Sequence, residues 1–178
     1  MLKILAAIAG AIVLAVIGVL AYATTKPDTF RVERVVTINA APDKIFPLIN
    51  DFRAWRDWSP YEDRDPDLKR TYSQPASGKG AVYAWDGATM GAGRMEILDA
   101  PPPSKVTIKL DFFRPFEANT TAEFAMTPSG NGTRVSWAMA GPNQYIGKVM
   151  SVFMDMDKMV GTDFEVGLQK LKARAEGS

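Results

Sequence analysis

The side chains that this chain offers for acid–base chemistry are carboxylates, lysines, arginines and tyrosines, because its 178 residues include no histidine and no cysteine. Their absence removes the imidazole and thiolate ligands of most zinc and copper sites. It also removes every nucleophile that depends on a histidine base, and the usual proton shuttle near neutral pH. We therefore expect no metal centre.

The acidic and phenolic side chains fall into two groups according to where the sequence pattern places them. Glu96 and Glu123 lie on the solvent face of predicted strands, and Asp86 and Asp111 lie near strand ends. None of these carboxylates is placed as the inward-facing base that aldol or dehydration chemistry needs. The remaining inward-facing candidates are Tyr61, Tyr83 and Arg34. Since a tyrosine more often anchors packing with its hydroxyl at the rim, the pattern favours binding over catalysis.

The charge and glycine patterns exclude two further classes of function. The net charge is +1 and the charged residues are scattered, whereas a nucleic-acid-binding protein normally has a clustered basic face. Gly87, Gly91 and Gly93 flank strands and do not open a helix, so they do not form a phosphate-binding loop. We expect no nucleic-acid partner and no organic cofactor.

An uncharged run at residues 4–25, bracketed by Lys3 and Lys26, dominates the start of the chain. At helical rise it spans about 33 Å, roughly the thickness of the hydrocarbon core of a bilayer. A single-pass membrane anchor is therefore predicted for residues 1–25, with an extracytoplasmic domain at 26–178 that is periplasmic if the protein is bacterial. The alternative is a cleaved signal, because Ala21-Tyr22-Ala23 is a small-x-small sequence.

Residues 26–178 read as one domain of mixed strands and helices. Alternating apolar residues predict a strand at 30–38, in which Arg34 falls on the apolar face, as expected for a bulge, an edge position or a polar group reaching into a cavity. Two short helices follow. Turn clusters then separate five further strands, whose apolar faces and polar faces alternate as in an antiparallel sheet with one wet side. A shorter strand is predicted at 69–72, and a long amphipathic helix at 145–174 with a bend or break near Gly161.

Five sequence segments in this order resemble the START-like superfamily, which includes polyketide cyclase/dehydrase and lipid transport families. They span nearly all of residues 30–175 and are Phe30-Arg-Val-Glu-Arg34, Ile38-Asn-Ala-Ala-Pro-Asp-Lys-Ile-Phe46, Asn50-Asp-Phe-Arg-Ala-Trp-Arg-Asp-Trp-Ser-Pro60, Gly91-Ala-Gly-Arg-Met-Glu-Ile97 and Gly161-Thr-Asp-Phe-Glu-Val-Gly-Leu-Gln-Lys-Leu171. The resemblance implies an α+β helix-grip fold, in which a curved antiparallel sheet wraps around a long C-terminal helix. It also implies a hydrophobic cavity between the two that holds a lipid, polyketide or other apolar molecule.

The apolar faces of the strands and helix predict which residues would line this cavity. The expected ligand-binding residues are Trp58, Tyr83, Trp85, Met95, Phe112, Phe124, Trp137, Met150, Phe153 and Met154. The methionines among them are adaptable and suit a loosely specified ligand, although the same residues would also fill a closed core. Trp55 and Trp58 form either an entry gate or a packing corner.

Three functions remain open. The favoured one is membrane-anchored binding or transport of a hydrophobic small molecule. The alternatives are a polyketide cyclase/dehydrase-like enzyme and an envelope interaction module whose core is filled by its own side chains.

Overall fold

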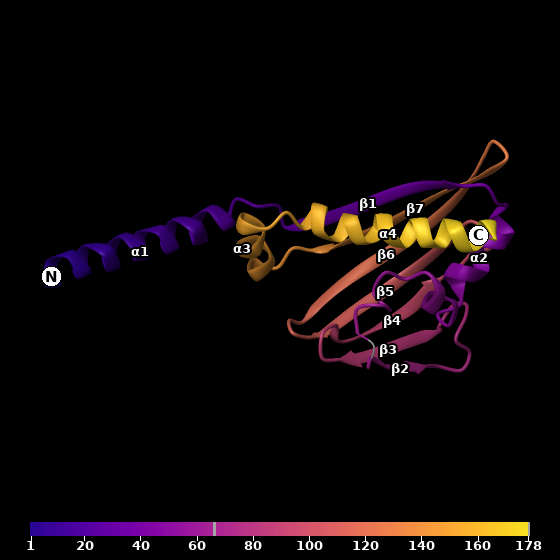
Figure 1. Cartoon of the computed structure of the whole chain (residues 1–178), viewed down its shortest axis with the longest axis horizontal. Coiled ribbons are helices and arrows are strands. Elements are labelled where there is room, and N and C mark those ends of the chain that lie inside the picture. Colours follow the sequence, from indigo (N-terminus) through magenta and orange to yellow (C-terminus); the bar gives the residue numbers. More distant parts are fainter. Residues whose placement is uncertain (66, 178) are drawn as a thin grey trace.

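The computed structural model describes residues 1–65 and 67–177. An N-terminal helix stands apart from a domain built on one sheet (Figure 1). In chain order the elements are α1 (Leu2–Ala23), β1 (Thr29–Ile38), α2 (Pro42–Asn50), the 3₁₀ helix η1 (Ala54–Asp57), β2 (Lys69–Tyr72), β3 (Val82–Gly87), β4 (Gly91–Asp99), β5 (Lys105–Arg114), β6 (Ala118–Ser129), β7 (Gly132–Pro142), α3 (Tyr145–Phe153) and α4 (Met156–Glu176).

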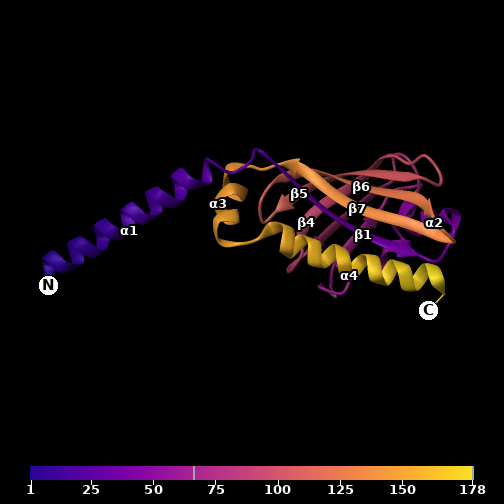
Figure 2. The same cartoon turned by 90° about the horizontal axis from the view of Figure 1, so that it is seen from above.

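The seven strands form one antiparallel sheet in the order β1-β7-β6-β5-β4-β3-β2. The first strand pairs with the last, so the edges are β1 and β2. Helix α4 runs across one face of the sheet, with α2 and η1 closing the end away from α1 (Figures 1 and 2). The predicted α+β helix-grip fold is confirmed, including the short strand at 69–72.

The core lies between the sheet and α4, and its residues follow the alternation of the sequence. On β6, for example, Ala122, Phe124 and Met126 are buried, whereas the residues between them are partly exposed. The contiguous core extends from Val32 to Leu171 and includes none of the α1 residues whose burial is described. The domain therefore has a hydrophobic core of its own.

The predicted long helix at 145–174 is wrong in one respect, because it is two helices. The chain is extended at Met154 and Asp155, and the Asp155 carboxylate accepts a hydrogen bond from the Lys158 backbone N–H at 3.0 Å. Asp155 is thus an N-cap that starts α4. The predicted bend at Gly161 does not occur, since α4 continues through it.

Gly161 instead gives room to Arg34, the inward-facing residue of edge strand β1. Arg34 pairs in register with Trp137 without a bulge. Its guanidinium lies against α4, donating to Glu165 at 2.7 Å and to Asp157 at 3.0 Å. A Cβ built on Gly161 would lie 1.9 Å from Arg34 Nη2. The glycine therefore lets this strand and helix approach closely around an ion-paired arginine.

We expect Gly161→Ala to lower the free energy of unfolding by about 1–3 kcal/mol, because the new methyl group displaces the guanidinium. In an open helix the same change stabilises by up to about 1 kcal/mol. Urea unfolding of the wild type and of Gly161→Ala, each with Arg34 and with Arg34→Ala, checks this. The penalty should vanish once the guanidinium is removed, and a penalty of equal size in both backgrounds would contradict the account.

Helix α1 is long and apolar enough, by length and composition, to cross a membrane, and a signal sequence would have the same properties. It meets the domain at α3, where the Tyr145 hydroxyl donates to the Leu20 carbonyl at 3.0 Å.

Candidate functional site

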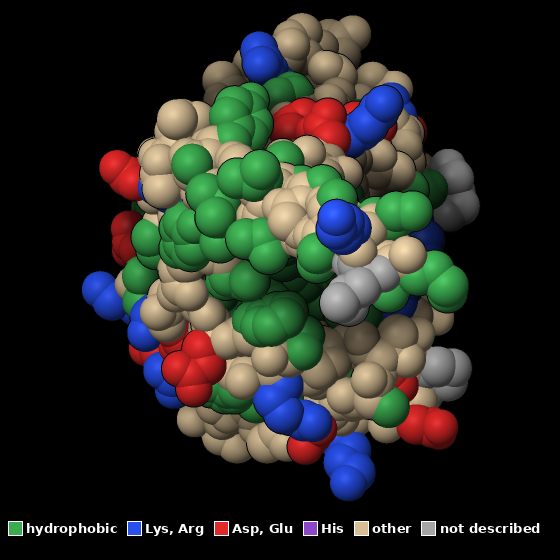
Figure 3. All heavy atoms as spheres, turned by 90° about the vertical axis from the view of Figure 1, so that its left-hand side faces the viewer, with side chains coloured by type: hydrophobic (Ala, Val, Ile, Leu, Met, Phe, Trp, Pro, Cys, Tyr) green, Lys and Arg blue, Asp and Glu red, His purple; other side chains and the backbone are tan. Residues whose placement is uncertain are grey.

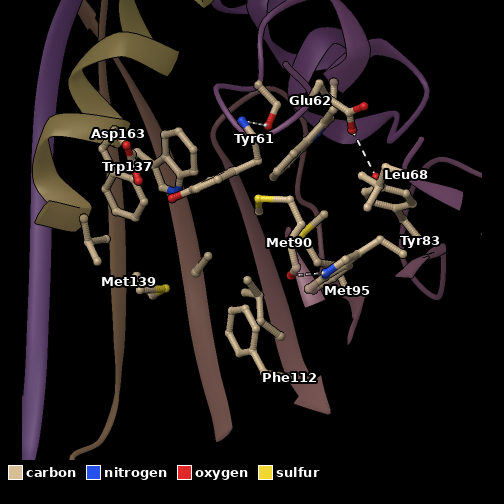
Figure 4. Close-up of a pocket in the computed structure, with 17 residues that line it drawn as sticks. Tyr61, Glu62, Leu68, Tyr83, Met90, Met95, Phe112, Trp137, Met139 and Asp163 are labelled. Carbon is tan, nitrogen blue, oxygen red and sulfur yellow. Dashed lines mark hydrogen bonds between the residues drawn. The ribbon is translucent and has the colours of Figure 1, made fainter. Parts of the chain in front are cut away.

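A cavity of about 230 Å³ lies between the sheet and α4. Its wall comes from the inner faces of β3 to β7, from the first turns of α4, and from the loop between η1 and β2 (Figure 4). The sheet and helix contribute Tyr83, Trp85, Met95, Leu110, Phe112, Ala122, Trp137, Met139, Val160, Asp163 and Phe164. Because most of these side chains are apolar, the cavity suits an apolar molecule.

The loop between η1 and β2 forms one side of the cavity with Ser59, Tyr61, Glu62 and Leu68. Asp65 holds this loop against the turn between β3 and β4. Its buried carboxylate accepts hydrogen bonds from the backbone N–H groups of Thr89 at 2.9 Å and Met90 at 3.3 Å. These bonds position Met90, which also lines the cavity.

Glu62 is a carboxylate in the cavity wall that is fully engaged by its neighbours. It accepts a hydrogen bond from the Tyr83 hydroxyl at 3.0 Å (Figure 4) and pairs with Arg70 Nε at 2.6 Å. Burial raises the pKa of Tyr83 well above its usual range, and the Glu62 charge raises it further. Tyr83 therefore stays protonated and acts as a hydrogen-bond donor.

A second polar group lies on the opposite side of the cavity, near α4. Asp163 forms an ion pair with Arg64, whose guanidinium also lies 5.5 Å from the centre of the Tyr61 ring. Burial, and then the Asp163 charge, raise the pKa of Tyr61 well above its usual range. Nearby, the buried indole N–H of Trp137 finds no acceptor among residues 1–65 and 67–177. Trp137 is thus a donor that a ligand can satisfy.

We expect Glu62→Gln to lower the pKa of Tyr83. The substitution removes the negative charge that disfavours tyrosinate and leaves the Arg70 cation beside the hydroxyl. The pKa should remain above the ordinary value of 10.0, because burial persists. Absorbance titration at 295 nm, with Tyr83→Phe to identify the component, measures this shift. An unchanged high-pH component would contradict the pairing.

Five of the ten predicted ligand-binding residues line this cavity: Tyr83, Trp85, Met95, Phe112 and Trp137. Trp58 and Phe124 do not, because both are fully buried within the aromatic core. Trp58 Nε1 donates to the Leu48 carbonyl at 2.9 Å, and its ring lies 4.8 Å from that of Trp55. Trp58 is therefore a packing residue of the core and does not form an exposed gate.

Met150, Phe153 and Met154 also lie outside the cavity. The expectation assumed one continuous helix over the sheet, but the break at Met154 places α3 beside α1, beyond the end of the sheet (Figures 1 and 2). Phe153 is consequently 71% exposed.

Sequence reasoning missed the polar part of the wall. Glu62 and Asp163 were not identified because the first lies in an irregular loop and the second on the polar side of a predicted helix. Tyr61 was identified only as an inward-facing candidate. Among the described residues, no three carboxylates gather as a metal site.

Comparisons with known proteins agree with this architecture. Protein CV1439 from Chromobacterium violaceum is 16% identical with a TM-score of 0.59, over 84% of this chain and 99% of that one. Aha1 from Colwellia psychrerythraea is 17% identical with a TM-score of 0.61, over 83% and 96%. StfQ, a di-domain ARO/CYC from the steffimycin biosynthetic pathway, is 13% identical with a TM-score of 0.62, over 84% and 51%. At these identities the likeness shows the fold alone.

No curated protein matches the chain. A family model described as polyketide cyclase/dehydrase and lipid transport matches residues 29–176, which include the whole sheet and α4. The chain therefore belongs to the polyketide cyclase/dehydrase and lipid transport family.

Proposed function

We propose that this protein is a membrane-anchored domain that binds or carries a hydrophobic small molecule, lipid or polyketide-like, in the cavity between the sheet and α4. The observation that carries the proposal is the cavity itself, whose wall is apolar apart from a few polar groups. Burying apolar ligand surface there contributes about 25 cal/mol per Å², and the polar groups set the orientation.

The polar groups also suggest what kind of apolar molecule fits. Tyr61 and Trp137 provide donors, whereas the carboxylates of Glu62 and Asp163 are already paired with arginines. A ligand with an apolar body and one hydrogen-bond acceptor, such as a carbonyl or hydroxyl oxygen, would satisfy the Trp137 N–H.

Tryptophan fluorescence tests binding directly, because Trp55, Trp85 and Trp137 line the cavity. The domain from residue 26 onward, with folding checked by circular dichroism, is titrated with a doxyl-labelled fatty acid, whose nitroxide quenches tryptophan at short range. Saturable quenching at one molecule per domain is expected. Quenching that rises linearly without saturation, as free nitroxide produces, would count against a binding cavity.

The anchor is a separate part of the proposal. We propose that α1 remains attached and crosses the membrane once, leaving the domain on the extracytoplasmic side, in the periplasm if the protein is bacterial. The full chain should then stay with the membrane pellet after alkaline carbonate washing, with an intact N-terminus by mass. A mature N-terminus at Thr24 would instead identify residues 1–23 as a cleaved signal.

Catalysis is the second candidate, supported by the Glu62–Tyr83 and Tyr61–Asp163 groups in the cavity wall. A cyclase or dehydrase step would need one of them to transfer a proton. The raised pKa values of both tyrosines and the arginine pairing of both carboxylates make them poor bases at neutral pH. Turnover of a poly-β-ketone analogue that is lost in Tyr83→Phe or Glu62→Gln would favour the enzyme.

A further inference from the structure

A second apolar surface lies outside the cavity, at the end of the domain from which α1 projects. Helix α3 contains Ile146, Val149, Met150, Val152 and Phe153, yet none of its residues is buried. A short helix with this many apolar residues is normally stable only when one face is covered.

The end of β5 and the turn that follows it add to this surface. Phe113 is 52% exposed and Phe116 is 57% exposed. This turn lies at the same end of the sheet as α3 (Figure 1). Figure 3 views the molecule from this end with α1 projecting toward the viewer, so the apolar side chains of α1 contribute to the hydrophobic surface at its centre. We name α3 together with Phe113 and Phe116 the anchor-side face. Exposed apolar side chains at one end of a domain are typical of an interaction site.

Contacts between α1 and α3 fix where this face lies along the apolar helix. The Tyr145 hydroxyl donates to the carbonyl of Leu20, in the last turn of α1. The one cation of α3, Lys148, is turned toward Asp28 in an ion pair, and its side chain is only 11% exposed. Helix α3 therefore lies beside the end of the apolar span. Tyrosines such as Tyr145 favour this position, because it is the boundary between membrane and water.

We propose that the anchor-side face lies on the lipid bilayer that α1 spans, with α3 in the interfacial layer and Phe113, Phe116 and Phe153 among the acyl chains. This inference rests on the anchor in the proposed function, because α1 sets the level of the membrane. An amphipathic helix without buried residues, next to a membrane-spanning helix, has lipid as its nearest apolar medium.

The arrangement would also give the cavity a short route to lipid. Met90 lies in the turn between β3 and β4, Phe112 near the end of β5, and Val160 in the first turns of α4. These positions are all toward the α1 end of the domain (Figure 1). A molecule leaving the bilayer at the anchor-side face would meet this part of the cavity wall first.

Single cysteines can test the contact in the full chain, because the protein has no native cysteine. The variants Phe116→Cys and Phe153→Cys carry a nitrobenzoxadiazole label on the anchor-side face, and Ile12→Cys carries it within the span. Leu98→Cys is the matched control, since Leu98 is an apolar residue that is 40% exposed near the opposite end of β4. Each is reconstituted in phosphatidylcholine–phosphatidylglycerol nanodiscs with or without doxyl-labelled lipid.

We expect doxyl lipid to quench the labels at 116 and 153 several-fold more than the label at 98, with the label at 12 quenched most. Quenching at 12 but not at 116 and 153 would overturn the bilayer contact and leave the anchor standing. Blue-shifted but unquenched emission at 116 and 153 would place these labels against protein, such as a second copy of this chain, and would also overturn it. An unquenched label at 12 would overturn the anchor and this inference together, whereas ligand binding in the cavity is measured independently.

Discussion

Ala122→Leu should abolish most ligand uptake while leaving the domain folded. Ala122 lies on β6 with its side chain in the cavity wall, so a larger side chain occupies space that a ligand would take. We expect the affinity for a doxyl-labelled fatty acid to fall at least about tenfold, which corresponds to about 1.4 kcal/mol. Tryptophan quenching of the domain from residue 26 onward measures it.

The matched control is Thr121→Leu, one residue earlier on the same strand. Its side chain is exposed on the opposite face of the sheet, so it adds similar apolar bulk outside the cavity. Affinity in this variant should equal that of the wild type. Equal losses in both variants, or none in Ala122→Leu, would show that binding does not use the cavity. Because filling a void is often neutral or stabilising, Ala122→Leu should unfold no earlier than the wild type.

Trp58→Ala should have the largest effect on stability. Trp58 is fully buried, and its ring lies within 5.9 Å of the rings of Phe124 and Trp137. Removing it leaves a cavity in the aromatic core and leaves the Leu48 carbonyl without its donor. We expect a loss of about 3–5 kcal/mol in the free energy of unfolding. The thermal midpoint, measured by circular dichroism, should fall by about 10 °C or more.

Trp58→Phe separates packing from hydrogen bonding. It keeps an aromatic ring but removes the indole N–H, so the expected loss is about 1–3 kcal/mol. Fatty-acid affinity per folded molecule should be unchanged in Trp58→Phe, because Trp58 does not line the cavity. A large loss of affinity with little loss of stability would restore Trp58 as a ligand-binding residue.

Alternation of apolar and polar residues made most of the sheet predictable from the sequence. Each inner-face residue of β4 to β7 follows the period of two that a half-buried strand requires, as Met95 on β4 and Trp137 on β7 illustrate. Since the sheet and the apolar stripe of the helix must face each other, five of the residues that line the cavity could be predicted from the side of the strand on which they lie. Cavity residues that lie outside helices and strands, such as Glu62, could not be predicted in this way.

The C-terminal helices show the limits of predicting structure from the spacing of apolar residues. The apolar period continues from α3 into α4, so the sequence pattern favours one helix, whereas the break depends on the extended Met154 and the Asp155 cap. Arg34 and Gly161 show a related limit. Each breaks a local rule, an inward-facing charge and a glycine within a helix, and only the fold reveals that the two residues accommodate each other.

Under the proposed function, the membrane anchor would help the domain to bind its ligand. A domain held at the bilayer surface experiences a high local concentration of lipid-soluble molecules. Weak binding in a small cavity would then be sufficient for exchange with the membrane. The cavity volume of about 230 Å³ favours a compact molecule, or part of an acyl chain, over a large polycyclic ligand that is enclosed completely.

Native mass spectrometry of the domain from residue 26 onward, after exposure to a membrane-lipid extract, tests the central claim most directly. The account predicts a discrete added mass, one molecule per domain, that is retained in Thr121→Leu and lost in Ala122→Leu. Only the bare protein mass, in a domain that circular dichroism shows to be folded, would contradict a ligand-binding cavity and direct attention to protein partners.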